Sequence, residues 1–341
     1  MTDASTVSVF IPCYNYGRFL GDCLASVLSQ TGVDLRVLIV DDASTDDSAA
    51  VAAALAAADR RVELRVHTEN RGHIATYNEG MAWAADTYTV LIDPDDMLTP
   101  GSLQRACALL DTHPEVGLVY GRARVFRDGE SIPPPSDEPA SWTIWSGQEW
   151  FEARCRAATN CIYAPEVVVR TSWYRQLGGY RAELPHTADF EMWMRLALHA
   201  DVGYIAGPHQ AVYRQHPASF HHQRFNSELA ELPQYVAAFA VLFRDYSDRI
   251  ADAEHLETMV RRTLAERALV AACGLYDRGP WRPDDAARFE QIAVTTYAGV
   301  GTLADMGRLQ RRKLLGPRLW PLVHPLWMAA RRTAAALRHA R

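Results

Sequence analysis

The chain of 341 residues is long enough for one large domain and a smaller one, and its 48% hydrophobic and 22% charged residues are ordinary for a globular protein. A formal net charge of −6 argues against a general nucleic-acid-binding protein. The six cysteines include no C-x-x-C pair, which argues against a zinc site or a disulfide framework and for reduced, mostly buried thiols.

The N-terminus has no signal-peptide pattern, because residues 1–8 are polar and run directly into a predicted strand. No apolar run approaches the roughly 18 residues that cross a bilayer. We therefore expect a cytoplasmic protein, either free or associated with a membrane surface.

Short apolar runs alternate with runs of helical spacing along the first third of the chain. This alternation predicts an α/β fold with a parallel sheet covered by helices on both faces. The predicted strands are 7–11, 35–40, 62–67 and 89–92, and the predicted helices are 19–28, 48–58, 74–85 and 103–110.

Polar residues follow each of these four strands. In an open α/β sheet, ligands bind beyond the carboxyl ends of the strands, so we expect the four clusters to meet at one edge. We interpret residues 1–115 as the half of the protein that binds a nucleotide diphosphate. The clusters are Tyr14 with Asn15, Asp41 with Asp42, Asn70 with Arg71, and Asp93 with Asp95.

The fourth cluster, D-P-D-D at 93–96, places three carboxylates within four positions, and Pro94 restrains the backbone between them. This much negative charge at one strand end is unfavourable unless a cation sits there. Closely spaced carboxylate oxygens suit Mg²⁺ or Mn²⁺, and such an ion attracts a diphosphate. An acidic turn exposed to water is the alternative.

Several other signatures are absent. No G-x-G-x-x-G follows the first strand, which argues against a dinucleotide oxidoreductase, and no G-x-x-x-x-G-K-[ST] is present to hold ATP. The G-x-S-x-G and H-E-x-x-H motifs are missing as well. The remaining option is a site in which acidic residues and a metal ion bind the phosphates.

As an ordered set, V-S-V-F-I-P-C-Y-N at 7–15, V-D-D-A-S-T-D at 40–46, N-R-G at 70–72 and D-P-D-D at 93–96 resemble glycosyltransferase family two, which has the GT-A fold. The resemblance covers residues 6–220, about two thirds of the chain. It implies an inverting sugar transfer from a nucleotide-diphosphate sugar to an acceptor nucleophile, assisted by Mg²⁺ or Mn²⁺. We expect UDP or dTDP in preference to GDP.

The resemblance also implies roles for individual residues. Asp42 would hydrogen-bond the base, and Arg71 would lie near the base or the phosphates. Asp93 would reach the ribose or the metal, and Asp95 would ligate the metal. The nucleotide cleft would be lined by Pro12, Tyr14, Asn15 and Asn70.

Some of these residues have a simpler interpretation. A plain turn after a strand is the alternative for Tyr14 and Asn15. We interpret Asp41, Asp46 and Asp47 as turn and cap residues, the usual roles of aspartate at such positions.

Residues 116–225 are expected to form the acceptor half. Strands at 117–120 and 123–126 are predicted to pair as a hairpin around Gly121, and the capping-box pattern S-G-Q-E at 146–149 opens a helix through Arg156. Trp142, Trp145 and Trp150 surround this helix and would either stack on sugars or pack in the core. The acceptor candidates are Trp145, Asn160 and His186.

The catalytic base is expected at the start of a later helix. Family members usually have a Glu-Asp pair there after Gly-Gly and a polar loop, and Asp189 matches the Asp, whereas Ala188 replaces the Glu. This departure leaves Glu191 as the alternative base. Residues 189 and 191 point about 200° apart on a helix, which favours Asp189. An ordinary helix cap is the simpler interpretation of Asp189.

The segment Y-R-Q-H at 213–216 resembles the strand end that follows the base in many relatives. Arg214 would neutralise the diphosphate. His216 would contact phosphate or complete the metal shell, and a structural or solvated histidine is the alternative.

Residues 226–341 read as helical, with helices at 229–246, 250–276 and 283–298. We expect this region to pack against residues 1–225, to dimerise or to dock a partner. Its tail, residues 306–341, holds nine Lys or Arg and no acid, interspersed with Leu and Trp. Such a segment suits an anionic membrane surface, and docking on the acidic body of the protein is the alternative.

Two other functions are alternatives on the sequence. A nucleotidyltransferase also uses carboxylates and a metal, but it normally needs a Gly-rich loop after its first strand, which is missing here. An inactive relative serving as a scaffold through its helical region is the alternative from another class.

Overall fold

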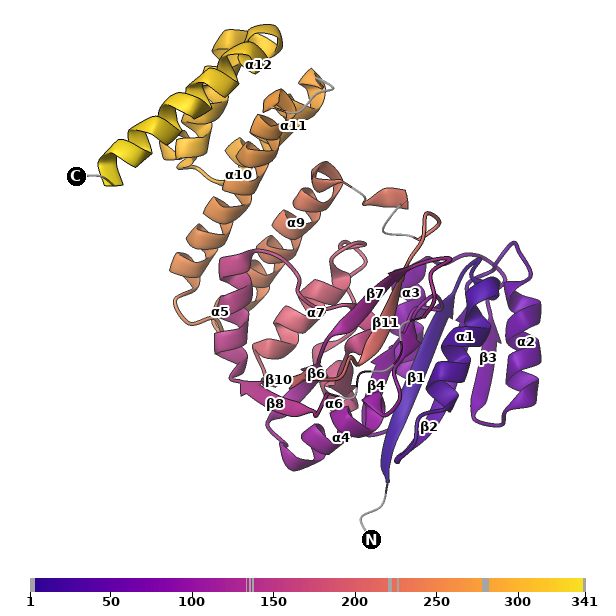
Figure 1. Ribbon diagram of the computed structural model, residues 1–341. Coiled ribbons are helices and arrows are strands. Elements are labelled where there is room, and N and C mark those ends of the chain that lie inside the picture. The colour runs from indigo at the N-terminus through magenta and orange to yellow at the C-terminus, as the bar shows by residue number, and fades with distance from the viewer. Residues whose placement is uncertain are drawn as a thin grey trace.

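The computed structural model of the protein describes residues 4–132, 134, 136, 138–219, 223–225, 227–277 and 282–339, with side chains as far as Val323 except at 318 and 321. An eight-stranded sheet in the order β3-β2-β1-β4-β9-β6-β10-β8 forms its centre (Figure 1). β1 (Ser5–Cys13) pairs in parallel with β2 (Val33–Asp41) and β4 (Tyr88–Leu91), and β3 (Val62–Val66) lies parallel to β2 at the edge.

The other half of the sheet contains two reversed strands. β9 (Val168–Arg170) runs antiparallel between β4 and β6 (Val116–Tyr120). β10 (Asp201–Ala206) is parallel to β6, and β8 (Ser141–Trp145) is antiparallel to β10 at the second edge. The sheet is therefore mostly parallel, as predicted.

Helices cover both faces, because side chains on a strand alternate between the two faces. Val9 and Ile11 of β1 belong to a core cluster with α1, α2 and α4, whereas Phe10 joins a second cluster with α3, α5, α6 and α7. The predicted α/β architecture is thus confirmed. These helices are α1 (Gly17–Leu28), α2 (Ser48–Ala58), α3 (His73–Trp83), α4 (Ser102–Thr112), α5 (Gly147–Ala157), α6 (Thr171–Leu177) and α7 (Ala188–Ala197).

The predicted hairpin around Gly121 is wrong. β6 is fully buried in the large sheet, whereas β7 (Ala123–Arg127) belongs to a second, three-stranded sheet. There β7 pairs in parallel with β11 (Ala211–Gln215), which also pairs antiparallel with β5 (Met97–Leu98). Met97, Phe126 and Val212 form the small core of this sheet. The chain therefore changes sheets at Gly121 instead of turning back on itself.

Local signals predicted several elements well. α2 spans the predicted 48–58, and the capping box at Ser146 and Glu149 is present at the start of α5. Strand β10 was not predicted. Strand β5 and helix α6 were not predicted because they are short, and β8 was not predicted because its side chains are mostly exposed.

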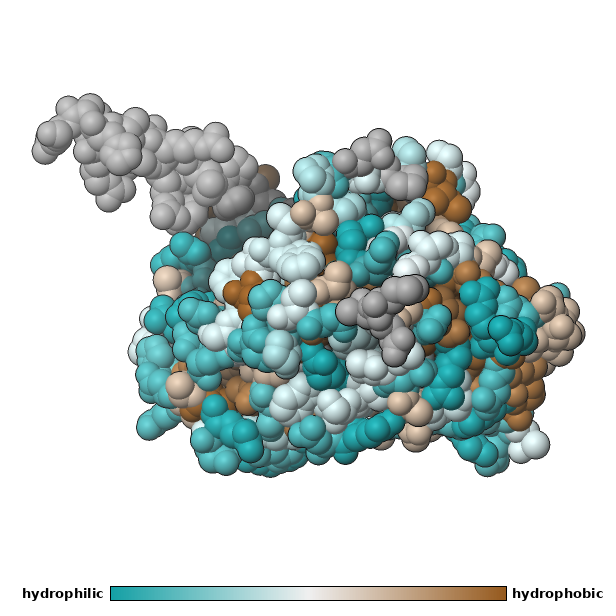
Figure 2. Space-filling view, turned by 90° about the horizontal axis from the view of Figure 1, so that it is seen from below, coloured by the Kyte–Doolittle hydropathy of each residue, from teal (hydrophilic) through white to brown (hydrophobic). Residues whose placement is uncertain are grey.

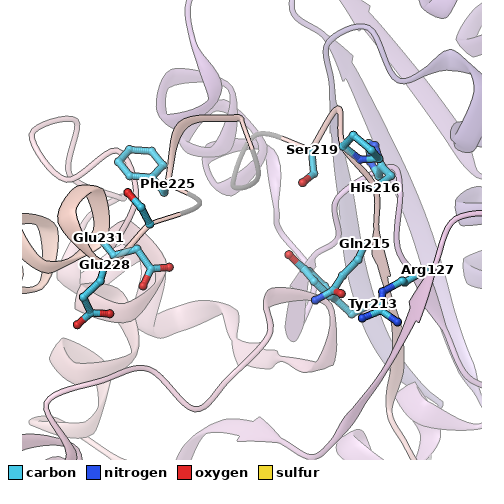
Figure 3. Close-up of a pocket in the computed structure, with 10 residues that line it drawn as sticks. Arg127, Tyr213, Gln215, His216, Ser219, Phe225, Glu228 and Glu231 are labelled. Carbon is cyan, nitrogen blue, oxygen red and sulfur yellow. The ribbon is translucent and has the colours of Figure 1, made fainter. Parts of the chain in front are cut away.

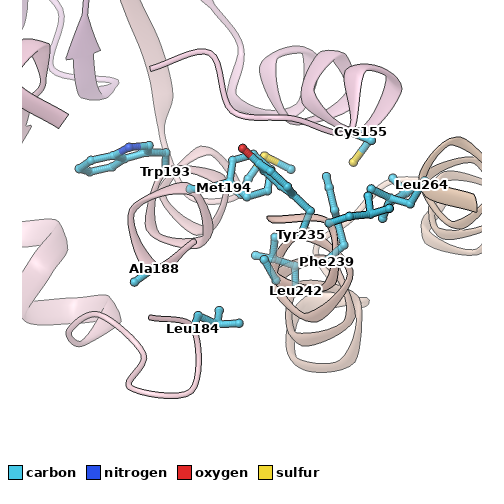
Figure 4. Packing of buried hydrophobic residues seen from close by; sticks show 14 of the residues in the cluster. Cys155, Leu184, Ala188, Trp193, Met194, Tyr235, Phe239, Leu242 and Leu264 are labelled. Atoms are coloured by element: carbon cyan, nitrogen blue, oxygen red, sulfur yellow. The ribbon is translucent and has the colours of Figure 1, made fainter. Parts of the chain in front are cut away.

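The C-terminal region consists of helices, and it packs against α5 and α7 of the preceding region. Phe190 of α7 contacts Tyr235 and Phe239 of α9, with ring centroids 5.4 and 5.3 Å apart. Figure 4 shows Tyr235 and Phe239 of α9 together with Met194 of α7, Cys155 of α5 and Leu264 of α10. The helices are α9 (Glu228–Tyr246), α10 (Ala253–Asp277), α11 (Pro283–Thr296) and α12 (Ala304–His339), and the short 3₁₀ helices are η1 (Ala164–Glu166) and η2 (Val300–Thr302).

The first part of the basic tail docks on the neighbouring helices. Arg312 lies 2.8 Å from Asp277, whose carboxylate also accepts a hydrogen bond of 2.7 Å from Trp320 Nε1. Lys313 lies 2.8 Å from Glu290. Gly316 interrupts α12 with a φ of 69°, a left-handed value that favours glycine.

No helix in the part of the chain that the structure describes is both long enough and apolar enough to span a membrane. On the face shown in Figure 2, hydrophobic residues occur in small groups among hydrophilic ones.

Candidate active site

Residues 93–96, here called the acidic loop, follow β4 and lie at the carboxyl edge of the large sheet. The Tyr77 hydroxyl of α3 donates a hydrogen bond of 3.1 Å to Asp93. Burial and the nearby charge of Asp95 raise the pKa of Asp93 to about 7. The same two causes raise the pKa of Asp96 well above its usual range. The loop thus concentrates more negative charge than its surroundings neutralise.

The end of β11 closes this loop from the other sheet. His216 Nε2 lies 3.0 Å from Asp95 Oδ2, and the backbone N–H of Arg214 donates to Asp96 at 2.9 Å. Two buried polar atoms of this cluster, His216 Nδ1 and Asp96 Oδ2, have no hydrogen-bond partner among the residues that the structure describes. Strand β11 therefore delivers an imidazole to the acidic loop.

The guanidinium of Arg214 is already engaged by the protein. It donates to the Asp95 carbonyl at 3.0 Å and to the carboxylates of Asp128 and Asp22 at 3.2 and 3.4 Å. It also lies over the ring of Phe19, 4.7 Å from the centroid. These contacts leave the side chain 8% exposed, so Arg214 braces the acidic loop in this structure.

Asp189 is the second residue of α7. Its Oδ1 accepts the backbone N–H of Phe190 at 2.7 Å, and its Oδ2 accepts Asn160 Nδ2 at 3.3 Å. Burial raises the pKa of Asp189. The negative charge of Asp189 is in turn one cause of the raised pKa of Asp93, so the two carboxylates are electrostatic neighbours. Tyr77, which donates to Asp93, also packs against Tyr180 in the loop before α7, with ring centroids 5.5 Å apart.

A tight contact positions the loop before α7. The side chain of Asn78 on α3 accepts the Tyr180 N–H at 2.7 Å and donates to the Tyr180 carbonyl at 2.9 Å. A Cβ at Gly179 would lie 2.1 Å from Asn78 Oδ1, so only glycine permits this approach. The loop that leads to Asp189 is thereby attached to the helix that carries Tyr77.

Glu191, the alternative base, points elsewhere. Its side chain is fully buried and forms ion pairs with Arg195 at 3.0 Å and Arg181 at 3.2 Å. Both of its carboxylate oxygens are therefore committed to structural contacts away from Asp93.

The loops after β1 and β2 are joined by hydrogen bonds. Asn15 has a φ of 59°, and its side-chain oxygen accepts the N–H of Thr45 at 2.7 Å. Tyr14 remains 43% exposed, whereas Pro12 is buried within β1 beside Val40. Of the four residues expected to line the cleft, Tyr14, Asn15 and Asn70 are exposed and only Pro12 is buried. Asp41 and Asp46 accept local backbone N–H groups, as turn residues do.

Asp42 organises the loop after β3. Its Oδ1 accepts the Arg71 N–H and its Oδ2 accepts the Gly72 N–H, both at 2.8 Å. Asn70 Oδ1 accepts the same Gly72 N–H at 3.1 Å. The Arg71 side chain is half exposed, 3.7 Å from Glu79. A further contact, from His67 to Asp42 at 2.7 Å, was not foreseen, because no motif marks His67 in the sequence.

The acceptor candidates separate in space. Asn160 contacts Asp189, and His186 lies close enough for its charge to affect the pKa of Asp189. Trp145, in contrast, pairs with Val202 at the start of β10, on the edge strand of the sheet. Because β10 runs parallel to β6, its start lies at the edge opposite the site, so the expectation that Trp145 binds the acceptor is not supported.

A cavity of about 440 Å³ opens between the end of β11 and the start of α9 (Figure 3). Tyr213, Gln215 and His216 line one side, and Phe225 and Glu231 line the other. The ring of Phe225 stacks on His186 with centroids 4.1 Å apart. The cavity therefore reaches from the acidic loop toward the surroundings of Asp189.

The acidic loop fits a divalent metal by its donor chemistry. Asp93 and Asp95 offer carboxylate oxygens, and His216 offers a nitrogen. Among the residues that the structure describes, no three His, Cys, Asp or Glu side chains form a ready-made metal cage. Mg²⁺ needs no such cage, because it is usually held by one or two carboxylates together with substrate phosphates. The unpartnered buried atoms of His216 and Asp96 agree with a missing positive partner.

Comparisons with known proteins identify the family. The model of glycosyl transferase family 2 matches residues 8–173. An uncharacterized protein of Mycobacterium tuberculosis is 30% identical over 236 residues, which is 62% of this chain and 68% of that protein. The chain belongs to glycosyltransferase family 2.

Solved structures of glycosyltransferases share its fold. The S. aureus protein TarS, solved with UDP-GlcNAc, aligns over 89% of this chain and 92% of its own with a TM-score of 0.59 and 14% identity. The mannosyltransferase PcManGT of Pyrobaculum calidifontis, solved with GDP-Man and Mn²⁺, aligns over 96% of this chain and 86% of its own with a TM-score of 0.57 and 18% identity. At these identities the likeness establishes the GT-A fold.

Proposed function

We propose that this family 2 member transfers a sugar from a nucleotide-diphosphate sugar to an acceptor nucleophile with inversion at the anomeric carbon. One observation carries the proposal: the Tyr77 hydroxyl donates to Asp93 at 3.1 Å, and the Tyr77 ring packs against Tyr180, in the loop that leads to Asp189, with centroids 5.5 Å apart. This packing supports a base and an acidic phosphate-binding loop near each other, at the edge of the sheet where ligands of α/β folds bind.

Asp189 would act as the general base. Burial raises its pKa, which makes the ionised carboxylate a better proton acceptor at neutral pH. The hydrogen bonds from Asn160 and the Phe190 N–H orient the carboxylate. The acceptor hydroxyl or amine would lose its proton to Asp189 and attack from the face opposite the diphosphate. Inversion follows from that geometry.

Asp93, Asp95 and His216 would hold Mg²⁺ or Mn²⁺. When bound, the ion would neutralise charge on the leaving diphosphate. The contact of 3.0 Å between Asp95 and His216 supports a shared role for these two residues. The structure of PcManGT was solved with GDP-Man and Mn²⁺, which supports a divalent ion in this fold.

The nucleotide would lie over the loops after β1, β2 and β3. Tyr14 would supply an open ring and Arg71 a half-exposed cation, whereas Asp42, which is buried, would reach the base only with a carboxylate that also accepts the Arg71 and Gly72 N–H groups. Pro12, Asn15 and Asn70 would shape the walls, because the last two bond neighbouring backbone groups. We propose UDP or dTDP as the nucleotide. Arg214 would act indirectly, by bracing the acidic loop.

The acceptor would enter through the cavity beside His216. Asn160 and His186 flank Asp189, and His186 is joined to the far wall of the cavity by its stacking on Phe225. We propose that residues 1–225 carry both substrates. Residues 226–341 would pack against α7 through α9. The start of α9 would supply Glu228 and Glu231 to the cavity wall on the side of Phe225.

The tail supports a further proposal, namely association with an anionic membrane surface. Leu314, Leu319 and Leu322 are 85%, 55% and 70% exposed, although Arg312, Lys313 and Trp320 nearby dock on the protein. Exposed leucines on a basic helix suit the boundary of an anionic bilayer. Such a location would place a cytoplasmic enzyme beside its membrane.

A thermal-shift panel tests the proposed function. UDP, dTDP and GDP are each added with and without Mn²⁺, and specific binding raises the melting temperature by mass action. We expect one nucleoside diphosphate to stabilise the protein, and to do so more strongly with Mn²⁺. No stabilisation by any of the three, at millimolar concentration with Mn²⁺, would contradict the proposal and favour a scaffold.

A further inference from the structure

His67, at the end of β3, is a buried histidine whose two ring nitrogens both face carboxylates. Nδ1 lies 2.7 Å from Asp42 and Nε2 lies 2.8 Å from Glu79 of α3. The side chain is 5% exposed, so water does not replace either contact. An ionised carboxylate only accepts hydrogen bonds, which means that each ring nitrogen must donate one. The ring is then a doubly protonated imidazolium.

The charge of this ring is balanced from several elements. Asp42 comes from the loop after β2 and Glu79 from α3, whereas Arg71 and Arg65 approach from the loop after β3 and from β3 itself. Burial lowers the pKa of His67, but the hydrogen bonds to Asp42 and Glu79 outweigh it and raise the pKa above its ordinary value. The two carboxylates therefore stabilise the imidazolium, whereas the positive charges of the two arginines oppose it.

The same Asp42 carboxylate holds the loop at 70–72. Its oxygens accept the N–H groups of Arg71 and Gly72, where Gly72 has a φ of 84° and begins α3. If the imidazolium were lost, Asp42 would lose one of three donors and its nearest full positive charge. The carboxylate would then be free to rotate away from both N–H groups.

We propose that His67 is a positioning residue for the nucleotide, fixing Asp42 and, through Asp42, the loop of Asn70, Arg71 and Gly72. This inference rests on the proposed function, because it assigns that loop to nucleotide binding. His67 itself touches no substrate. Its effect is on donor affinity, and the base Asp189 lies on a different element.

His67→Gln is the main test. The amide keeps one donor but removes the charge, so we expect the dissociation constant of the stabilising nucleoside diphosphate, chosen from UDP, dTDP and GDP with Mn²⁺, to rise about ten- to hundredfold. At saturating donor, kcat should stay unchanged, because binding is lost equally in ground and transition states. His113→Gln is the matched control, since His113 faces Glu115 at 3.0 Å on a surface away from the site.

Two further measurements make the outcome decisive. In the wild type, ring ¹⁵N chemical shifts of His67 should report an imidazolium at pH 7, and donor KM should rise as the pH climbs through the His67 pKa. Glu79→Gln removes the negative charge beside Nε2 of His67 and should shift the rise in donor KM to lower pH. This variant provides the test if His67→Gln does not fold.

A neutral His67 ring at pH 7, or wild-type nucleotide affinity in His67→Gln, would overturn the inference. If instead the wild type bound none of the three nucleotides, the proposed function would fail, and with it the role assigned to the loop.

Discussion

His216 Nε2 lies 3.0 Å from Asp95 Oδ2, joining the end of β11 to the acidic loop after β4. Asp95 lies in the loop between β4 of the large sheet and β5 of the small one, and His216 directly follows β11, which pairs with both β5 and β7. The proposed metal-binding residues are therefore assembled by tertiary structure. Their contact explains how a loop rich in carboxylates is held in one conformation before substrate binds.

Asp189→Asn tests the base. The variant keeps the size of the side chain and can still accept one of its two hydrogen bonds, but it cannot accept a proton, so we expect sugar transfer to fall about 10²- to 10⁴-fold. Nucleotide affinity by titration calorimetry should be unchanged, because Asp189 does not hold the donor. Asp34→Asn, on an exposed position of β2, is the control. Transfer near the wild-type rate would exclude Asp189 as the base.

Asp95→Asn and His216→Gln test the metal site. Each variant should weaken nucleoside diphosphate binding in the presence of Mn²⁺ about tenfold or more, since each removes a ligand or its partner. Binding measured in EDTA is the internal control and should be the same as in the wild type. Equal losses with and without Mn²⁺ would assign the two residues to folding instead of metal binding.

Glu191→Gln should affect stability more than chemistry. Glu191 is fully buried between Arg195 and Arg181, and breaking one partner of a buried ion pair costs about 3–5 kcal/mol. Urea unfolding measures the loss, and nucleotide binding by the folded variant should persist. A variant of normal stability that has lost transfer would make Glu191 the base after all.

Glu166 gives a pH-dependent prediction for stability. Burial raises its pKa from 4.5 to about 8, so the folded protein keeps a proton that the unfolded chain releases. The stabilising contribution is complete below pH 4.5 and is lost as the pH rises toward 8. Relative to Glu166→Gln, the wild type should lose unfolding free energy across this window, by a few kcal/mol at most. Parallel stability curves from pH 4.5 to 8 would contradict the assignment.

The exposed leucines of the tail allow a test that leaves its docking contacts in place. Replacing Leu319 and Leu322 by glutamate removes apolar surface but retains Arg312, Lys313 and Trp320. We expect wild-type protein to sediment with vesicles that contain anionic lipid and the double variant to stay in solution. Truncation after Gly307 should behave like the double variant. Unchanged sedimentation of both would leave the tail as a structural element only.

Sequence reasoning was most successful where local chemistry dominates. Strands β1, β2 and β4 are buried on both faces and read as continuous apolar runs. The loops after β2, β3 and β4, with Asp42, Asn70 and Asp93, could be placed at one edge because parallel strands end together. The helix that begins at Ala188 was predicted as well, and with it the position of Asp189.

Contacts between distant segments could not be read in this way. Strand β7 pairs with β11 instead of β6, a choice that depends on the small core of Met97, Phe126 and Val212. Trp145 was assigned to the acceptor site by residue type, but the antiparallel edge strand β8 carries it to the opposite edge of the sheet. His67 was missed for the same reason, because its partners Asp42 and Glu79 come from other elements.

The stereochemistry of the first product tests the central claim most directly. The donor sugar nucleotide, chosen from the nucleotide series that stabilises the protein, is incubated with enzyme and Mn²⁺, and the anomeric proton of the newly formed product is followed by NMR before mutarotation. The account predicts a product whose anomeric configuration is opposite to that of the donor. A product that retains the configuration of the donor would contradict direct attack assisted by Asp189.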